Sequence, residues 1–298
     1  MLGSAIVQAF AASRPNDDIV APSRDDVDLL DERATRALIS DVDPDVVVHA
    51  AAVVAGIAER ARHPGRFLAE NLRIDLNVVT ASADEGVGSL AYIGSAGAYP
   101  AAAPQPIRED ALLTGPYEPQ LEPYGLAKTA GARLCGYVSQ EKDLAYRALV
   151  PCNLYGPNDH FDSERAHLIP AAIAKVARAA REGGGVEIWG DGTARREYAY
   201  SPDVAAWVVD HVADLAALPP LMNLGAGSDH SVREYYEAIA RALDAEVELS
   251  FDPTRPRGVE RRLLDSTLAR NLGWSAPTSL DAGLAKTCSW YLEHAVAG

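Results

Sequence analysis

Short runs rich in β-branched residues alternate with longer, alanine-rich amphipathic segments through the first half of this chain. The runs that read as buried strands are 18–21, 46–51, 90–95 and 146–150. The helical patterns around them cover 3–12, 32–41, 64–85 and 124–141. Because the order is βαβα, it predicts an α/β fold in which a doubly wound parallel sheet carries helices on both faces.

The pattern changes after residue 155. Segments rich in glycine, proline and arginine, at 183–185, 190–193 and 253–258, separate shorter helical patterns at 167–181, 202–215, 231–243 and 279–295. We expect residues 1–155 to form a dinucleotide-binding domain, with a returning segment near 186–215. Residues 156–298 are expected to form mainly a smaller α+β lobe that binds substrate.

The chain begins in an unusual place for such a fold. A doubly wound dinucleotide fold opens with a strand and a glycine-rich turn, and the next helix then points its N-terminus at the pyrophosphate. Here Met1–Val7 reads directly as that helix, with Gly3 in the place of the last glycine of the turn. A start assigned about a dozen residues too late, or a trimmed chain, is the expected reason. The alternative is a polypeptide that lacks the strand and binds dinucleotide poorly or not at all.

The charge of the chain narrows the choice of partners. A net charge of −15 and a pI near 4.8 argue against nucleic acid or an anionic membrane, because both repel an acidic surface. An anionic ligand would have to meet a local cluster of arginines. Cys135, Cys152 and Cys288 are far apart without metal-ligand spacing, which indicates reduced thiols and no metal site. Without a membrane-spanning stretch or a signal peptide, the chain is expected to be soluble and cytoplasmic.

A possible proton-transfer unit consists of Ser95, Tyr124 and Lys128. A spacing of four places Tyr124 and Lys128 on one face of a helix, where the ammonium would lower the pKa of the phenol. Such a tyrosine can protonate a carbonyl oxygen that a serine hydroxyl holds by a hydrogen bond. A tyrosine packed on a helix beside a solvated lysine gives the same letters, so the surrounding sequence must decide. In a parallel sheet, Ala50–Ala52, Ser95 and Pro151–Asn153 should converge on one cleft at the carboxyl ends of the strands.

Four motifs in order carry a family resemblance. They are Glu-Pro-Tyr-Gly-Leu-Ala-Lys at 122–128, Asn-Leu-Tyr-Gly-Pro-Asn-Asp at 153–159, Trp-Gly-Asp-Gly-Thr at 189–193 with Arg196-Glu197, and Arg-Arg-Leu-Leu-Asp at 261–265. With them the chain resembles, over essentially its whole length, the extended short-chain dehydrogenase/reductases, also described as the NAD-dependent epimerase/dehydratase family. Within that family it is most similar to the GDP-L-fucose synthases, which epimerise and reduce GDP-4-keto-6-deoxymannose.

The resemblance implies a Rossmann-like fold and a role for individual residues. Ser95, Tyr124 and Lys128 would be catalytic, with Lys128 also reaching the nicotinamide ribose, and His167 would be the acid of the epimerisation. Arg24 would bind the 2′-phosphate of the adenosine, which favours NADP (NADPH) over NAD. The other implied cofactor positions are Gly3, Ala50, Ala51, Ala52, Asn71, Asn153 and Leu154. The implied substrate positions are Asn153, His167, Trp189, Arg196, Arg255, Arg261 and Arg262.

Simpler readings of several of these residues stay open. Arg24 could be a solvated surface charge, and the alanines at 50–52 could serve helix–strand packing. The arginines could form surface ion pairs with the abundant carboxylates. Trp189 could stack on the nucleotide or fill the core between the lobes.

The chain departs from the family where epimerisation needs a base. Gly97 stands where the synthases carry a cysteine, and glycine cannot move a proton. Cys152, at the next strand end, is a speculative replacement. Tyr200 stands where histidine is usual and Arg257 where aspartate is usual, which could change the sugar or nucleotide that is accepted.

These observations predict an NADP-dependent nucleotide-sugar oxidoreductase of the GDP-L-fucose synthase type. It would reduce the C4 ketone of a GDP-4-keto-6-deoxyhexose, with C3/C5 epimerisation doubtful. One alternative is a degenerate, non-catalytic protein that binds nucleotides or sugar nucleotides, and another is a nucleotide-sugar 4-epimerase that retains NAD tightly. By analogy with the family we expect a homodimer that pairs segments 64–85 and 124–141 into a four-helix bundle.

Overall fold

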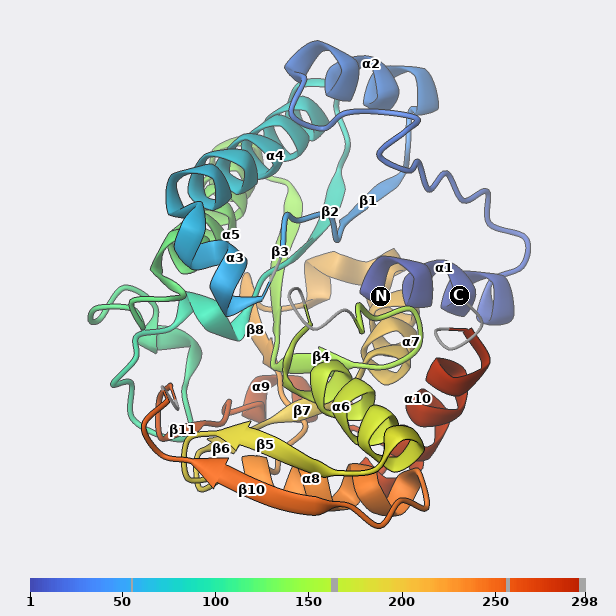
Figure 1. The fold of residues 1–298 in the computed structure, drawn as a ribbon. Helices are drawn as coiled ribbons and strands as arrows, with labels where there is room; N and C mark the ends of the chain where they lie inside the picture. The colour runs from blue at the N-terminus through green and yellow to red at the C-terminus, as the bar shows by residue number, and fades with distance from the viewer. Residues whose placement is uncertain (55, 162–165, 256–257, 295–298) are drawn as a thin grey trace.

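The structure is a computed structural model that describes residues 1–54, 56–161, 166–255 and 258–294. Its central feature is a parallel sheet with the order β1-β2-β3-β8 (Figure 1). The strands are β1 (Val46–His49), β2 (Ser89–Ile93), β3 (Ala145–Pro151) and β8 (Leu221–Leu224). Three of the four predicted strands are therefore confirmed, together with their parallel arrangement.

Helices cover both faces of this sheet. On one face lie α2 (Glu32–Val42), α4 (Pro64–Asp84) and α5 (Glu122–Lys142), and on the other lie α1 (Leu2–Ser13) and α7 (Ser201–His211) (Figure 1). Alternate strand residues serve the two faces, because Tyr92 packs with α4 and α5 while Ile93 packs in a core with α7. The predicted doubly wound α/β architecture is confirmed.

The prediction of a strand at 18–21 is wrong. These residues are exposed and form no regular secondary structure. Their sequence is compatible with a strand, but a strand needs a neighbour to pair its backbone groups. Among the described residues, β1 is an edge strand of the parallel sheet, and residues 18–21 pair neither with β1 nor with any other strand.

The second half of the chain forms three small sheets. β4 (Asn153–Tyr155) pairs with β7 (Tyr198–Tyr200), and β5 (Gly185–Trp189) pairs with β10 (Glu248–Asp252). β6 (Arg195–Arg196) lies between β9 (His230–Ser231) and β11 (Arg261–Arg262). The remaining helices are α3 (Ile57–Arg62), α6 (Leu168–Glu182), α8 (Val232–Ala242), α9 (Thr267–Arg270) and α10 (Leu280–His294), with 3₁₀ turns η1 (Ala96–Ala98), η2 (Glu109–Ala111) and η3 (Val212–Ala217).

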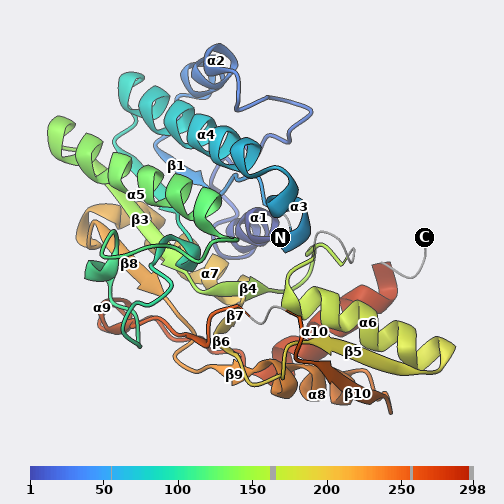
Figure 2. The same cartoon turned by 60° about the vertical axis from the view of Figure 1, so that its left-hand side comes forward.

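The second hydrophobic core lies among α6, α8, α10 and β5 (Figure 2). The chain returns to the parallel sheet through α7 and β8, whereas β5 stays in the second region. The eight predicted helices are all present, with ends within a few residues of those expected. None of the helices in the described ranges combines the length and the apolar character that a bilayer crossing requires.

Candidate active site

Ser95 lies directly after the buried strand β2, at the carboxyl edge of the sheet. Its Oγ atom accepts a hydrogen bond of 3.1 Å from the amide of Gly97, so the side chain caps the 3₁₀ turn η1. The cap fixes the hydroxyl oxygen while the side chain stays partly accessible.

Tyr124 reaches Ser95 from the first turn of α5. The next residue, Gly125, lies so close to η1 that a β-carbon there would meet the carbonyl oxygen of Gly97 at 2.5 Å. Only a residue without a side chain allows this approach, which brings the Tyr124 hydroxyl into a hydrogen bond with Ser95. The structure therefore brings together the serine and the tyrosine that the sequence predicts.

The pKa of Tyr124 differs from the expectation. It is raised to about 12, first by burial and second by the negative charge of Asp75, while the hydrogen bond with Ser95 and the charge of Arg60 act in the opposite direction. The expectation that Lys128 lowers this pKa is therefore wrong for the protein as the structure has it. The phenol is protonated at neutral pH, which suits a proton donor rather than a base.

The reason lies in the surroundings of Lys128. Its side chain is only 2% exposed, and its Nζ atom lies 3.4 Å from Asp75 Oδ1 and 3.3 Å from the carbonyl oxygen of Ile93. The ammonium also lies 4.6 Å from the centre of the Tyr92 ring. The ammonium is thus paired with a carboxylate whose own charge raises the pKa of the phenol.

Arg60, on α3, is a residue that the sequence reasoning missed. Its side chain is buried, its Nε atom has no hydrogen-bond partner, and within the described chain no carboxylate lies at ion-pair distance from it. Its positive charge nevertheless acts on Tyr124 and on His167. Burial of a guanidinium is costly, and it lowers the pKa of Arg60, while the charge of Glu118 opposes this. No local pattern in the sequence marks it.

His167 immediately precedes α6 and does not cap it. The residue is exposed, but neighbouring protein atoms displace part of the water around its ring, and this together with the positive charge of Arg60 lowers the pKa of His167 to about 4. The imidazole is therefore neutral at pH 7. A neutral imidazole can accept a proton but is a weak acid, so the implied role of His167 as an acid stays a prediction.

Gly97 lies at the reacting end of the site. A β-carbon at this position would lie 3.3 Å from Ser95 Oγ and 3.8 Å from Cδ1 of Tyr124. A cysteine here would contact both catalytic side chains, and this protein has no group in that place. Cys152 does not replace it, because burial raises the pKa of its thiol well above the usual value.

Two arginines from the second half of the chain, Arg196 and Arg262, lie near a carboxylate from the first half, Glu118. Arg262 is 6% exposed, donates a hydrogen bond of 2.6 Å to the carbonyl oxygen of Ala96, and forms an ion pair of 3.7 Å with Glu118. Burial lowers the pKa of Arg196, and the charge of Glu118 opposes this. Arg261, the next residue along, points elsewhere and pairs with Asp229. Its implied role in substrate binding stays a prediction.

Trp189 and Arg255 form an exposed platform. The Trp189 side chain is 50% exposed, so it does not fill a core, and the Arg255 guanidinium lies 5.4 Å from the ring centre. An exposed indole can stack on a nucleotide base. Tyr200 is buried beneath Lys286, and Arg257 lies outside the described residues.

The implied cofactor residues fall into two groups. Asn71 is fully buried and all its bonds are internal, since its amide binds both backbone groups of Val53 and the carbonyl oxygen of Phe67. It holds the loop after β1 in place. The others remain at least partly accessible: Gly3, Arg24, the alanines at 50–52, Asn153 and Leu154. Nδ2 of Asn153 donates a hydrogen bond of 3.1 Å to the carbonyl oxygen of Glu197. Their contacts with a cofactor stay a prediction.

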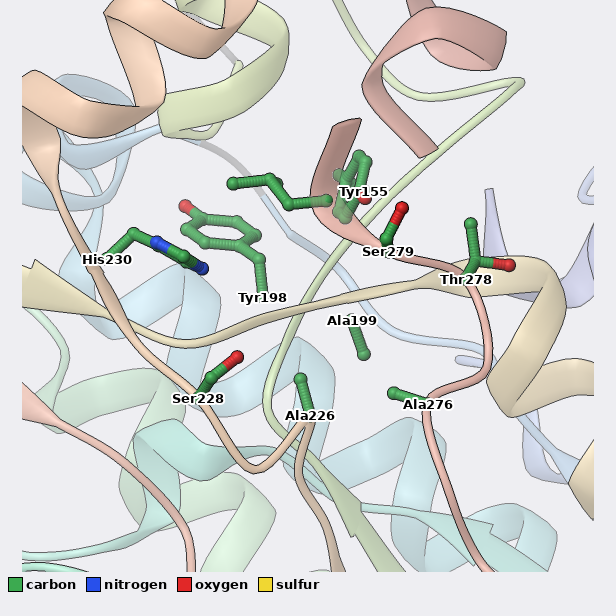
Figure 3. Close-up of a pocket in the computed structure, with 10 residues that line it drawn as sticks. Tyr155, Tyr198, Ala199, Ala226, Ser228, His230, Ala276, Thr278 and Ser279 are labelled. Carbon is green, nitrogen blue, oxygen red and sulfur yellow. The ribbon is translucent and has the colours of Figure 1, made fainter. Parts of the chain in front are cut away.

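A small cavity lies apart from these residues. It has a volume of about 120 Å³ and is lined by Tyr155, Tyr198, His230 and Thr278, among others (Figure 3). None of Ser95, Tyr124 and Lys128 lines it. Ligand pockets of about 300 Å³ or more are usual, so it is too small for a nucleotide sugar.

Comparisons with known proteins agree with this geometry. Residues 1–225 match the NAD dependent epimerase/dehydratase family. The chain is 37% identical over 279 residues to a GDP-L-colitose synthase of Yersinia pseudotuberculosis, which covers 93% of this chain and 91% of that protein. It is 40% identical over 282 residues to a GDP-L-fucose synthase of Azorhizobium caulinodans, with coverages of 94% and 90%. A solved GDP-mannoheptose C4 reductase from Campylobacter jejuni with NADP bound has a TM-score of 0.87 at 28% identity, covering 98% of this chain and 95% of that chain.

Proposed function

The chain belongs to the NAD dependent epimerase/dehydratase family, and on that premise we propose that it is an NADP-dependent reductase of GDP-4-keto sugars. It is of the GDP-L-fucose synthase type and acts on the C4 ketone of a GDP-4-keto-6-deoxyhexose. The names of its relatives, two GDP-sugar synthases and a C4 reductase that binds NADP, support this choice.

The residues present fit a bound dinucleotide. Helix α1 begins without a side-chain cap and without an acidic residue in its first turn, so its amide groups can meet a pyrophosphate. Gly3 in that turn is exposed, and no atom lies within 4 Å of the position that a β-carbon would take. Arg24 is exposed and forms no ion pair with any residue in the described ranges, so it can meet a 2′-phosphate.

The reduction uses the hydrogen bond between Tyr124 and Ser95. NADPH, when bound, supplies a hydride to C4 of the sugar. Tyr124 donates its proton to the ketone oxygen, and Ser95 holds that oxygen by a hydrogen bond. The carbon gains the hydride, the oxygen gains the proton, and the phenolate left behind takes a proton back from solvent. The charge of Arg60 favours this phenolate.

The protein reduces without efficient epimerisation. Inversion at C3 or C5 needs one group to remove a proton and a second to return it on the opposite face. Gly97 provides no base, and the buried thiol of Cys152 stays protonated. The keto sugar is therefore reduced in the configuration in which it arrives.

We propose that the second half of the chain binds the rest of the substrate. Arg196 and Arg262 meet the diphosphate near Glu118, and Trp189 with Arg255 receives the guanine. The parallel sheet with its helices holds the cofactor. This division follows the expected boundary near residue 155, with α7 and β8 as the parts that return to the sheet.

The hydrogen bond between Tyr124 and Ser95, at the carboxyl end of β2, carries the proposal. The test is to mix the purified protein with NADPH and GDP-4-keto-6-deoxymannose and to follow the absorbance of NADPH. Tyr124→Phe should lower the rate by about 10³-fold, because the ring stays and the proton is lost. A folded wild-type protein that consumes no NADPH would contradict the proposal.

We also propose a homodimer in the cytoplasm. Helices α4 and α5 lie side by side (Figure 2) and expose apolar side chains, namely Leu72, Leu76, Leu126 and Tyr137. Two such pairs can form a four-helix bundle. Light scattering should give twice the chain mass, and Leu76→Glu should give the mass of the monomer.

The cysteines bear on the proposed cytoplasmic location. Three of them are free and buried, which suits a reducing compartment.

A further inference from the structure

Four side chains from four different elements form a buried polar cluster beneath the catalytic tyrosine. Asp75, on α4, is at its centre and is 1% exposed. Its Oδ1 atom lies 2.9 Å from His49 Nε2 and 3.4 Å from Lys128 Nζ. Its Oδ2 atom accepts a hydrogen bond of 2.6 Å from the hydroxyl of Tyr92. The carboxylate is therefore held from three sides, by β1, β2 and α5.

A glycine makes room for this cluster. Gly131 lies on α5 one turn after Lys128, and a β-carbon there would lie 2.6 Å from Asp75 Oδ2 and even closer to the Tyr92 hydroxyl. Any larger residue would push α4 and α5 apart at this point. The contact between Asp75 and α5 is thus part of how the two helices pack.

When Asp75 and Lys128 are ionised, their opposite charges balance at a distance of 3.4 Å. Burial lowers the pKa of His49, so this ring is neutral. Burial acts to raise the pKa of Asp75, but the hydrogen bond with His49 and the charge of Lys128 outweigh it, and the pKa lies below its usual value. Burial lowers the pKa of Lys128, and Asp75 is the first group that opposes this. The ammonium therefore depends on one carboxylate.

We propose that Asp75 is a positioning residue for the reduction: it fixes the Lys128 ammonium one helical turn from Tyr124 and keeps it charged in the protein interior. The inference rests on the proposed reductase function for its kinetic part only. His49 and Tyr92 orient the carboxylate, and neither carries charge at neutral pH. Cys135 on α5 also faces the cluster, and burial raises the pKa of its thiol, so it adds no charge.

The proposal has a definite consequence for pH dependence. Asp75→Asn removes the counter-ion, so Lys128 loses its proton at lower pH than in the wild type. The Asp75 charge also raises the pKa of Tyr124, so its removal makes the phenol lose its proton earlier. Reduction needs both groups protonated, and both effects therefore move the alkaline limb of kcat to lower pH. A purely structural role would change stability without moving this limb.

The first measurement does not depend on activity. The chain has four lysines, Lys128, Lys142, Lys175 and Lys286, so their ¹³Cε signals can be followed by NMR through a pH titration. Lys128→Met assigns the signal. In Asp75→Asn the Lys128 signal should titrate at least one pH unit lower than in the wild type, a tenfold change in the protonation equilibrium. An unchanged titration would overturn the proposal.

The second measurement is kcat against pH. Asp75→Asn should lower kcat by about 10- to 100-fold and move the alkaline limb in the same direction as the NMR titration. Asp75→Glu keeps the charge but displaces the ammonium, so kcat should fall while the alkaline limb stays. This variant gives a readout even if the asparagine variant does not fold.

Asn77→Ala is the matched control for the loss of a buried polar group, because Asn77 lies on the same helix and its side chain donates a hydrogen bond to the carbonyl oxygen of Leu29. A limb that moves in Asn77→Ala as far as in Asp75→Asn, or a limb that moves in Asp75→Glu, would refute the role of the charge. A wild type without reductase activity would instead remove the proposed function and leave the titration of Lys128 as the test.

Discussion

Nη1 of Arg262 donates a hydrogen bond of 2.6 Å to the carbonyl oxygen of Ala96, the residue that follows Ser95. A side chain from β11 therefore supports the turn that presents the catalytic serine. The same guanidinium forms an ion pair with Glu118. The second half of the chain contributes in this way to the position of Ser95.

Replacing Arg262 should impair both activity and folding. Arg262→Gln breaks the ion pair of the buried guanidinium with the partly buried Glu118 and should lower the free energy of unfolding by about 3 kcal/mol. A displaced Ser95 should lower kcat by about tenfold or more. Arg261→Gln is the control, because Arg261 is 43% exposed and pairs with Asp229 away from the turn. Equal losses in the two variants, measured by denaturant unfolding and by NADPH consumption, would contradict the assignment.

The raised pKa of Tyr124 predicts different pH dependences for the two directions of the reaction. Reduction needs the protonated phenol, and with a pKa of about 12 the proton is present throughout the neutral range. Oxidation of the product alcohol by NADP needs the phenolate, whose fraction rises about tenfold per pH unit below that pKa. Initial rates of oxidation should therefore climb between pH 7 and 9, while Tyr124 imposes no loss on reduction. An oxidation rate independent of pH would argue against Tyr124 as the proton carrier.

Restoring a thiol at position 97 should restore proton exchange at C3 and C5. In deuterated water the wild type should incorporate little deuterium into the keto sugar, because no base faces these carbons. A side chain at this position contacts Ser95 and Tyr124, and the closest contact, 3.3 Å, requires a small adjustment of the serine. Gly97→Cys should raise incorporation, detected by mass spectrometry, and Gly97→Ala should not. Rapid exchange in the wild type would show that another group acts as the base.

The alternation of strand and helix patterns predicts most of the architecture, because each element carries local signals of its own. Pro64 opens α4, and the capping box of Ser231 and Glu234 opens α8. The error at 18–21 has a different origin. Strand propensity records how a residue suits a pleated surface, and it does not record whether a neighbouring strand is present.

The placement of Tyr124 and Lys128 on one helix could be predicted for the same local reason, since the two residues are spaced four apart. Their charges could not. Asp75 lies 53 residues from Lys128 and 17 from Tyr92, and only the fold brings them together. One signal was available, because Asp75 follows Asn71 by four residues and both lie on the buried face of α4. Arg60 and Glu118 give no such signal.

Removing the buried charge of Arg60 should stabilise the protein and impair the enzyme. Arg60→Gln removes a buried cation that has no carboxylate at ion-pair distance among the residues that the structure describes, so the free energy of unfolding should rise by about 1 kcal/mol. The same change should lower kcat/KM by about tenfold, because a charge that favours the phenolate and can meet the substrate is lost. Arg62→Gln on the same helix is the control, since that side chain is 61% exposed. A less stable Arg60→Gln protein with unchanged kcat/KM would contradict this role.

The buried carboxyl of Glu197 should make the fold less stable as the pH rises above 6.5. Glu197 is 1% exposed, and its two oxygens accept hydrogen bonds from the amides of Gly227 and Leu264. Burial raises its pKa to about 7, although these amides act in the opposite direction. The folded protein thus keeps a proton that the unfolded chain has released above its ordinary pKa of 4.5.

The stability that this proton contributes is therefore complete below a pH of about 4.5 and is lost as the pH rises through 7. Between pH 6.5 and 8 the loss should be about 1 kcal/mol. Other groups also titrate in this window: His49 and His167 have pKa values below their ordinary 6.5 in the folded protein and add a slope of the opposite sign, and Asp159, with a pKa raised to about 6, adds a small slope of the same sign. The contribution of Glu197 is therefore the difference between two proteins: urea unfolding at several pH values should show that the wild type loses about 1 kcal/mol relative to Glu197→Gln between pH 6.5 and 8. Glu248→Gln, an exposed carboxyl on β10, should keep the slope of the wild type. If Glu197→Gln kept it too, the proton would belong to another group.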